Sequence, residues 1–482
     1  MSLRRCVHCS GRNLRLLAAA GLMSFVTLTA TSTPSAQAVQ GPDMFGIAMG
    51  GESQYQEATT RERELDAIQA VGSRWVRIDL TWSVIQDGGP STYDWTEVDR
   101  IVRGITSRGM KVLGTIAYTP SWARPAGTTE KHGPDPDQYA AFAAKAVQHY
   151  AAMGVHHYEV WNEPNIGFWA PKPDPAAYTK LLKAAYPAIK GADPSATVLT
   201  GGTAPASTEG SNYSPVDFLK RIYANGGGDS FDAVAHHPYC WAATTFPGEP
   251  EEWSAWHQME GTGQSLRSVM KANGDAAKKI WGTEYGAPTN GPPDDRVTER
   301  QQADMITKAY TLWKDYEWAG PLFIYQGRDI GTDTSTREDF FGLLRHDFSK
   351  KPSYTAYRNL VAGVGNASGA ARTTIKVKGK GRRGRGSANG IVSIRPDANG
   401  AESVEPTGSV KLKLYRQARR GWRSVTRART AQLREAGRFR KRLKGSHGGG
   451  LAPGSYRIKA LYAGSPAAEP SVARSRRFKL RP

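Results

Sequence analysis

Eight short apolar runs alternate with longer amphipathic stretches between residues 44 and 360, and this alternation limits the possible folds more than any other feature. The runs are 44–49, 75–80, 111–117, 157–161, 197–201, 232–236, 279–283 and 321–325. The stretches 62–71, 139–152 and 178–190 carry apolar residues at helical spacing. Strands that alternate with helices form a parallel sheet, and eight of them close a barrel. We therefore expect an α/β fold, a (β/α)8 TIM barrel. A doubly wound open sheet is the alternative, but no Gly-rich phosphate-binding loop follows the first run.

The N-terminal segment has the pattern of an export signal. Four arginines precede or flank the start of an apolar run over 16–30, and Ala36-Gln37-Ala38 is a small-x-small cleavage site. This pattern predicts a signal peptide over 1–38 and a secreted, extracellular protein. An uncleaved membrane anchor is the alternative, for which the run is short. Cys240 is the one cysteine of the mature chain, so no internal disulfide is expected.

Charge divides the mature chain into two parts. Residues 371–482 hold 29 Lys/Arg and 5 Asp/Glu, a net charge of +24, whereas residues 39–370 carry a net charge of −8. We expect a (β/α)8 barrel domain over 39–363, a basic Gly/Ser-rich linker over 364–388 and a small basic all-β sandwich over 389–482. The sandwich is indicated by short alternating segments at 390–395, 409–415, 422–426, 438–443, 455–462 and 472–480, separated by turn residues.

Two glutamates stand at the ends of predicted barrel strands. Glu163 lies in WNEP (161–164) after the fourth run, and Glu284 ends the seventh in IWGTEYG (280–286). The strand C-termini of a (β/α)8 barrel form its active face. Cleavage of a glycosidic bond needs two such carboxyl groups, a neutral acid that protonates the leaving oxygen and a charged partner. Either glutamate alone would be read as a surface residue, but the pair predicts catalysis.

The chain resembles the clan A glycoside hydrolases, which are retaining (β/α)8 enzymes. Within the clan it is similar to bacterial family 39 and cellulase-like proteins. The stretches that carry the likeness are WVRIDLTW (75–82), YTPSWA (118–123), YEVWNEPN (158–165), FDAVAHHPY (231–239) and WGTEYGAPT (281–289). In the C-terminal part, turn-rich segments such as PTGSV (406–410) and LAPGSY (451–456) resemble bacterial Ig-like domains.

The resemblance implies roles for six residues. Glu163 matches the acid/base and Glu284 the nucleophile, while Asn162 matches the amide that binds the neighbouring sugar hydroxyl. Arg77 matches the arginine that holds the nucleophile charged; a structural ion pair is the alternative.

His237 and Tyr239 match a His-x-Tyr pair in which the tyrosine hydroxyl binds the nucleophile. Because His236 adjoins His237, the sequence leaves open which ring faces the cleft. A metal site on both rings is not expected, since neighbours on a strand point to opposite faces.

Sugar binding calls for flat apolar faces beside polar groups. The aromatic candidates that follow predicted strand ends are Trp82, Tyr118, Trp122, Phe168, Trp169 and Trp241. The clan usually carries a tryptophan at the end of strand eight, but this chain has Tyr325-Gln326 there, so either residue is a candidate substitute.

These features predict a secreted, retaining O-glycoside hydrolase that cleaves β-glycosidic bonds in a poly- or oligosaccharide, as a monomer and without metal or cofactor. The alternatives are a catalytically silent carbohydrate-binding protein and a cell-envelope adhesin. The basic C-terminal part is expected to attract anionic cell-wall or exopolysaccharide polymers and to retain the protein at the envelope. A merely solvated basic surface is the alternative. Sequence-specific nucleic-acid binding is not expected, because no groove-reading motif is present.

Overall fold

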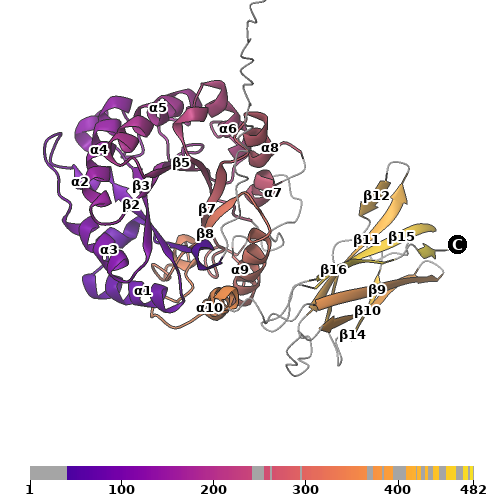
Figure 1. Cartoon of the computed structure of the whole chain (residues 1–482). Coiled ribbons are helices and arrows are strands. Elements are labelled where there is room, and N and C mark those ends of the chain that lie inside the picture. The colour runs from indigo at the N-terminus through magenta and orange to yellow at the C-terminus, as the bar shows by residue number, and fades with distance from the viewer. Residues whose placement is uncertain are drawn as a thin grey trace, which may run out of the picture. The chain divides into compact units, whose positions relative to one another are not determined.

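The computed structural model describes residues 41–240, 254–260, 263–293, 296–365, 373–382, 385–394, 409–418, 421–424, 429–432, 438–443, 452–462, 471–475 and 478–480. Eight parallel strands close a barrel in chain order, and helices surround it (Figure 1). The strands are β1 Phe45–Ala48, β2 Trp75–Thr81, β3 Lys111–Ala117, β4 His157–Asn162, β5 Thr197–Gly202, β6 Ala233–His236, β7 Lys279–Tyr285 and β8 Ala319–Tyr325. β1 also pairs with β8, so the sheet has no free edge. The predicted TIM barrel is confirmed.

The helices around the barrel are α1 Ala58–Ala70, α2 Trp82–Ile85, α3 Thr96–Ser107, α4 Pro136–Ala151, α5 Pro175–Ala192, α6 Pro215–Ala224, α7 Ala255–Glu260, α8 Leu266–Ala272, α9 Glu299–Trp313 and α10 Pro352–Gly365. Several of them begin at a helix-start signal of the sequence. α4 and α5 each start with a proline after an aspartate whose side chain accepts two backbone N–H groups. Among the described residues, no helix combines the length and the apolar character needed to cross a membrane.

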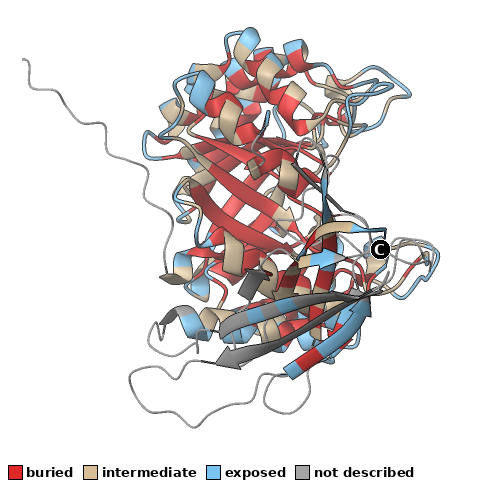
Figure 2. Ribbon diagram, turned by 90° about the vertical axis from the view of Figure 1, so that its right-hand side faces the viewer, coloured by how far each residue is buried: buried red, intermediate tan, exposed pale blue. Residues whose placement is uncertain are grey.

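The barrel strands are buried on both faces, which explains why they read as apolar runs (Figure 2). Their outward side chains pack against the helices. The inward side chains at the lower end of the barrel form a separate aromatic and aliphatic cluster that includes Trp75, Trp281 and Phe323. Inward positions recur at every second residue of a strand. On β2 they are Trp75, Arg77 and Asp79, so the inward side chains change from aromatic to charged along this strand. The barrel interior is therefore filled by aromatic side chains near the start of β2 and by charged side chains further along it.

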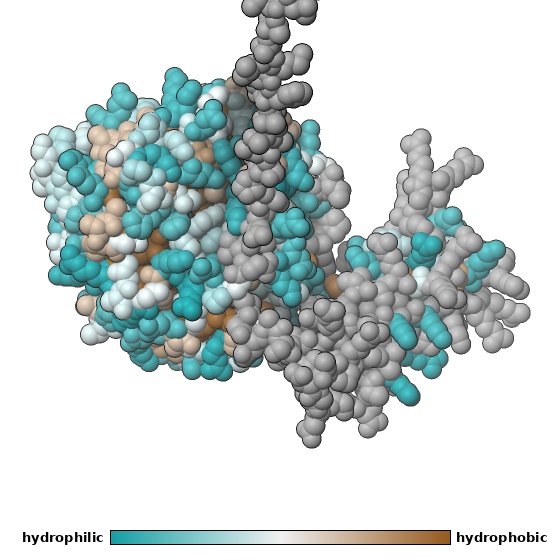
Figure 3. All heavy atoms as spheres, in the orientation of Figure 1, coloured by the Kyte–Doolittle hydropathy of each residue, from teal (hydrophilic) through white to brown (hydrophobic). Residues whose placement is uncertain are grey.

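Polar residues also cover the outside of the barrel domain. The space-filling view shows mostly hydrophilic residues over the helices, with hydrophobic residues confined to small patches (Figure 3).

The C-terminal part forms two antiparallel sheets, as expected of a small all-β domain. Their strands are β9 Thr373–Arg382, β10 Arg385–Ile394, β11 Ser409–Ala418, β12 Gly421–Ser424, β13 Arg429–Gln432, β14 Arg438–Leu443, β15 Gly454–Tyr462, β16 Ser471–Arg474 and β17 Phe478–Leu480. One sheet has the order β14-β10-β9, and the other contains β12-β11-β15-β16 with β13 on β11 and β17 on β15. Val410, Leu412 and Leu414 of β11 are fully buried and provide its core.

The expected linker over 364–388 needs correction. α10 extends to Gly365, and most of the remaining segment forms β9 and the start of β10. Ile375 and Val377 alternate with Lys376 and Lys378, which is a strand pattern. The Gly- and Arg-rich composition hid this alternation. The expected segment 472–480 also forms two strands, β16 and β17, rather than one.

Candidate active site

Glu163 and Glu284 meet at the mouth of the barrel. Glu163 directly follows β4 and Glu284 lies near the end of β7. One carboxylate oxygen of each lies within 4.8 Å of the other and of a ring nitrogen of His237. Their side chains are 14% and 12% exposed, so both are reachable from solvent. The two residues lie far apart in sequence, and closure of the barrel brings them together.

Arg77 fixes the geometry around Glu284. Its Nη1 donates to Glu284 Oε1 at 2.7 Å, its Nη2 to Asn162 Oδ1 at 2.8 Å, and its Nε to Glu159 Oε2 at 2.7 Å. Burial disfavours the charged guanidinium, but the carboxylates of Glu159 and Glu284 outweigh burial and raise the pKa of Arg77. The guanidinium is therefore a permanent positive charge beside Glu284, and the three bonds hold its plane in one orientation.

Glu159 is a site residue that the sequence analysis missed. Its carboxylate is 0% exposed and accepts four hydrogen bonds. The donors are Arg77 Nε, Thr115 Oγ1 at 2.8 Å, Gly202 N at 2.8 Å and Thr283 Oγ1 at 3.0 Å. A buried carboxylate is costly unless hydrogen-bond donors and a positive charge surround it, as they do here. Its role is to anchor Arg77 from below, and a carboxylate within an apolar strand was the available signal.

The adjacent histidines His236 and His237 have different surroundings, one in the core and one at the site. His237 Nδ1 lies 3.0 Å from Glu163 Oε1 and 3.5 Å from Glu284 Oε2, so this ring bridges the two carboxylates. His236 instead contacts the Thr203 hydroxyl and the Ala255 carbonyl. Burial lowers the pKa of His236 to about 3, whereas the two glutamates outweigh burial and raise the pKa of His237. His237 is the ring that faces the site.

Tyr239 completes the contacts of Glu284. Its hydroxyl donates to Glu284 Oε2 at 2.9 Å. Burial and the charge of Glu284 raise the pKa of Tyr239 well above its usual value, so the hydroxyl keeps its proton. Both oxygens of Glu284 therefore accept a hydrogen bond, one from Arg77 and one from Tyr239, and the two bonds fix the orientation of the carboxylate.

The backbone is in left-handed conformations at the strand ends that carry the site. Trp161 has φ 73°, Glu163 has φ 47° and Tyr118, after β3, has φ 72°. Such values are unfavourable for bulky residues and persist only where the surrounding structure enforces them. They interrupt the alternation at the end of β4, where the consecutive residues Asn162 and Glu163 both contact site residues.

Two of the predicted sugar contacts lie in the core. Trp82 is 0% exposed, stacks on Phe142 with ring centroids 5.4 Å apart, and donates to Gln86. It is the first residue of α2, and its ring belongs to the main hydrophobic core rather than to the barrel mouth. Trp169 is also buried and packs edge-on against Trp161. Neither side chain offers a flat face to a sugar.

The other aromatic candidates lie closer to the mouth. Tyr118 and Trp122 are partly exposed, and Trp122 Nε1 donates to the Gln86 carbonyl. At the end of β8, Tyr325 points inward and its ring lies 5.3 Å from that of Phe341, while the adjoining Gln326 is buried. Trp241 lies outside the described residues.

Asp79 is a second residue that the sequence analysis missed. It follows Arg77 by two positions on β2, faces inward and is partly exposed at the barrel mouth. Its carboxylate lies close to the Gly51 backbone, where a methyl group added to Gly51 would lie 3.1 Å from Asp79 Oδ2. Burial and the charge of Asp79 raise the pKa of Tyr118. Asp79 and Tyr118 therefore line the same side of the mouth.

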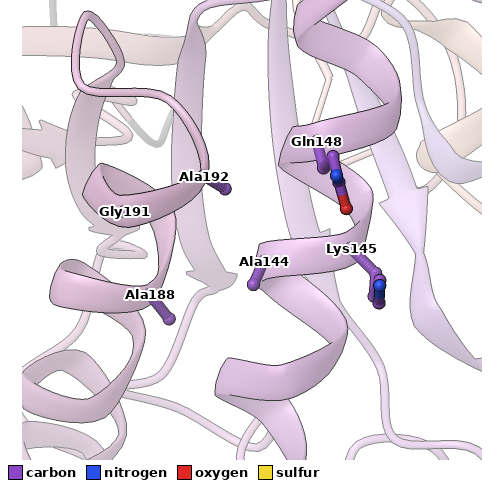
Figure 4. Close-up of a pocket in the computed structure, with 6 residues that line it drawn as sticks. All are labelled: Ala144, Lys145, Gln148, Ala188, Gly191 and Ala192. Atoms are coloured by element: carbon purple, nitrogen blue, oxygen red, sulfur yellow. The ribbon is translucent and has the colours of Figure 1, made fainter.

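The donor atoms of Glu163, His237 and Glu284 have a spacing that could also hold a metal ion. Because Arg77 and Tyr239 already donate hydrogen bonds to the two Glu284 oxygens, the arrangement suits a carboxylate held by hydrogen bonds better than a metal ligand. A hollow of about 390 Å³ on the outside of the barrel, between α4 and α5, is lined by small residues with Lys145 and Gln148 (Figure 4). It holds no catalytic pair.

Comparison with known proteins identifies relatives of the barrel. Residues 34–319 match the family Cellulase (glycosyl hydrolase family 5). No curated protein matches the sequence. A family 39 glycoside hydrolase from Bacteroides cellulosilyticus WH2 has a similar fold, with a TM-score of 0.55 and 21% identity over 84% of this chain and 79% of that chain.

Two further solved structures share the fold. A monomeric β-xylosidase from Caulobacter crescentus CB15 has a TM-score of 0.52 and 20% identity over 79% of this chain and 84% of that chain. A GH39 enzyme from Xanthomonas axonopodis pv. citri has a TM-score of 0.50 and 16% identity over 85% of this chain and 93% of that chain. The resemblance to clan A is confirmed. Since the family match spans more than half of the sequence, the chain belongs to the cellulase family of glycoside hydrolases, glycosyl hydrolase family 5.

Proposed function

We propose that the protein is a secreted, retaining β-glycosidase in which Glu284 is the nucleophile and Glu163 the acid/base. The observation that carries this proposal is the distance between the two carboxyl groups. Retaining enzymes hold them roughly 5 Å apart, whereas inverting enzymes leave about 6.5–9.5 Å for a water molecule. A separation within 4.8 Å between carboxylate oxygens fits direct attack on the sugar.

The contacts of the two glutamates support this division of roles. Glu284 accepts hydrogen bonds from a guanidinium and a phenol, which stabilise the negative charge that a nucleophile needs. Among the described residues, His237 is the one hydrogen-bond partner of the Glu163 carboxylate. Because the guanidinium and the phenol both bind Glu284, we assign the remaining role of acid/base to Glu163.

The reaction then has two steps. The Glu284 carboxylate forms a bond to the anomeric carbon as the bond to the leaving oxygen breaks, and Glu163 gives its proton to that oxygen. In the second step Glu163 takes a proton from water, the water oxygen bonds to the anomeric carbon, and Glu284 leaves. Arg77 and Tyr239 bind the Glu284 charge before and after each step, and Asn162, held by Arg77, binds the neighbouring sugar hydroxyl.

The test is a panel of 4-nitrophenyl β-glycosides, including the xyloside, together with neutral and acidic polysaccharides. Proton NMR identifies the first anomer released. We expect the β-anomer first and a loss of at least about 10²-fold in kcat for Glu284→Gln. Glu163→Gln should lose about 10²–10⁴-fold on substrates with poor leaving groups and much less on dinitrophenyl glycosides, which need no acid.

Glu97→Gln on α3 is the matched control, since Glu97 lies outside the barrel and is 41% exposed. Release of the α-anomer first would contradict retention. Full activity in both catalytic-site variants would contradict the site itself, and binding of glycans without hydrolysis would favour the carbohydrate-binding alternative.

Export and oligomeric state need separate measurements. We propose export because of the basic and apolar N-terminal pattern and the Ala36-Gln37-Ala38 site. N-terminal sequencing of the protein from the culture medium should give a start near Val39. We also propose a monomer, by analogy with the monomeric β-xylosidase of similar fold. Light scattering after size exclusion tests this.

A further inference from the structure

The three-stranded sheet β14-β10-β9 carries basic residues on both outer strands, and the register aligns them. Lys376 of β9 and Arg438 of β14 both lie opposite Ile391 of the central strand β10. Residues directly opposite one another on antiparallel strands point to the same face. The two cations therefore flank one position of β10 on one face of the sheet.

The next row repeats this arrangement. Lys378 of β9 and Arg440 of β14 both lie opposite Asn389, two residues along β10. Arg442 lies two residues beyond Arg440 on the same side of β14. Phe439, between Arg438 and Arg440, is buried, so the neighbouring even-numbered residues point to solvent.

We call this surface the basic face, and its residues are Lys376, Lys378, Arg438, Arg440 and Arg442. All five are exposed. Along a strand, such residues recur at roughly 6.5–7 Å, and β9 and β14 lie roughly 9.5 Å apart across β10. The face is therefore a regular array of positive charges in two columns.

These charges have no acidic partners within the described part of the domain. None of the nine described strands, β9–β17, contains an aspartate or a glutamate. No ion pair joins a residue of the basic face to a carboxylate among the described residues. Like charges this close repel each other and cost stability, and a polyanion that neutralises them relieves that cost.

We propose that the basic face binds an anionic polysaccharide, a chain with a carboxylate on repeated sugar units. A regular charge array suits a regular polyanion, and arginine side chains bind carboxylates through two parallel N–H groups. Single-stranded nucleic acid is disfavoured, because its binding sites use aromatic side chains for base stacking. The five side chains of the basic face include no aromatic.

The proposal does not depend on the hydrolase site. The described strands that form the basic face belong to the C-terminal domain, whereas both catalytic candidates lie on barrel strands. Loss of glycoside hydrolysis would leave polysaccharide binding intact, and loss of binding would leave hydrolysis of small aryl glycosides intact. The two failures are therefore distinguishable in one preparation of the full mature chain.

The experiment measures binding of the full mature chain to polygalacturonate at several salt concentrations. The key variant is Arg438→Gln/Arg440→Gln. The charge-matched control is Lys413→Gln/Lys459→Gln, which removes two cations that lie opposite each other on the other sheet. These lysines point away from the core, because Leu412, Leu414 and Ile458 next to them are buried.

We expect the Arg438→Gln/Arg440→Gln variant to weaken binding at least tenfold and to lower the slope of log affinity against log salt by about 1 to 2. The control should bind within about twofold of wild type. Equal weakening in both variants would show a response to net charge alone and overturn the assignment to this face, as would no weakening in either. Tighter binding of single-stranded DNA than of polygalacturonate would overturn the ligand class. Neutral dextran should not bind. Circular dichroism and aryl glycoside hydrolysis check that both variants are folded.

Discussion

Glu159→Gln tests whether the buried carboxylate anchors Arg77. The substitution keeps the shape of the side chain but replaces one of its acceptor oxygens with an NH2 group. The hydroxyls of Thr115 and Thr283 can rotate to accept from it, but Arg77 Nε and Gly202 N can only donate. At best the new amide oxygen faces Arg77, and the Gly202 N–H is left opposite another donor.

The cost follows from these contacts. An unsatisfied buried N–H costs about 1–3 kcal/mol, and the bond to Arg77 loses its charged acceptor, which costs about 1 kcal/mol more. We therefore expect the free energy of unfolding to fall by about 2–4 kcal/mol. The Arg77 guanidinium also loses one of its three fixed contacts, so kcat/KM should fall as well.

The assay is urea unfolding followed by tryptophan fluorescence, with Glu97→Gln as the matched control. An exposed ion pair of the Glu97 kind contributes only about 0–1 kcal/mol. If Glu159→Gln costs no more than Glu97→Gln, the carboxylate does not anchor Arg77 and the reasoning fails.

Three further outcomes are expected. Asp79→Asn should lower kcat/KM about tenfold with little change in melting temperature, because a charged acceptor at the barrel mouth becomes neutral; an unchanged kcat/KM on every substrate would remove Asp79 from the site. Gly202→Ala should abolish most activity, since the new methyl carbon would lie 2.3 Å from His237 Nε2, whereas Gly363→Ala, with open space around it, should not. Burial raises the pKa of Glu260 from 4.5 to about 7, so the native state holds this proton more tightly than the unfolded state. Stability should therefore decline as pH rises from about 4.5 to 7, and a melting curve series should show no such decline for Glu260→Gln; an identical decline would assign it to other groups.

The barrel strands were predictable because they are buried on both sides. Each reads as an apolar run, and β3 was expected at the bounds that it has. The catalytic pair was predictable for a related reason. Glu163 and Glu284 interrupt the chain where apolar runs end, and the ends of parallel strands meet at one face.

The missed residues show where sequence patterns fail. Glu159 and Asp79 lie inside strands, and only the closed barrel shows that their side chains point inward and toward Arg77. Trp82 was misjudged because its place after a strand end says nothing about which way its ring points. β9 was taken for a linker because its glycines and cations outweighed the two apolar residues that alternate with them.

The bonds of Arg77 have a consequence for how activity arises. This one side chain joins β2, β4 and β7, and its partner Glu284 lies 207 residues further along the chain. No contiguous segment shorter than that span can assemble the nucleophile with its cation. Catalytic competence therefore requires β2, β4 and β7 to be assembled in one barrel. Half-barrels and proteolytic fragments that lack one of these strands should be inactive even where their local structure is intact. The return of activity during refolding would therefore report when the barrel closes.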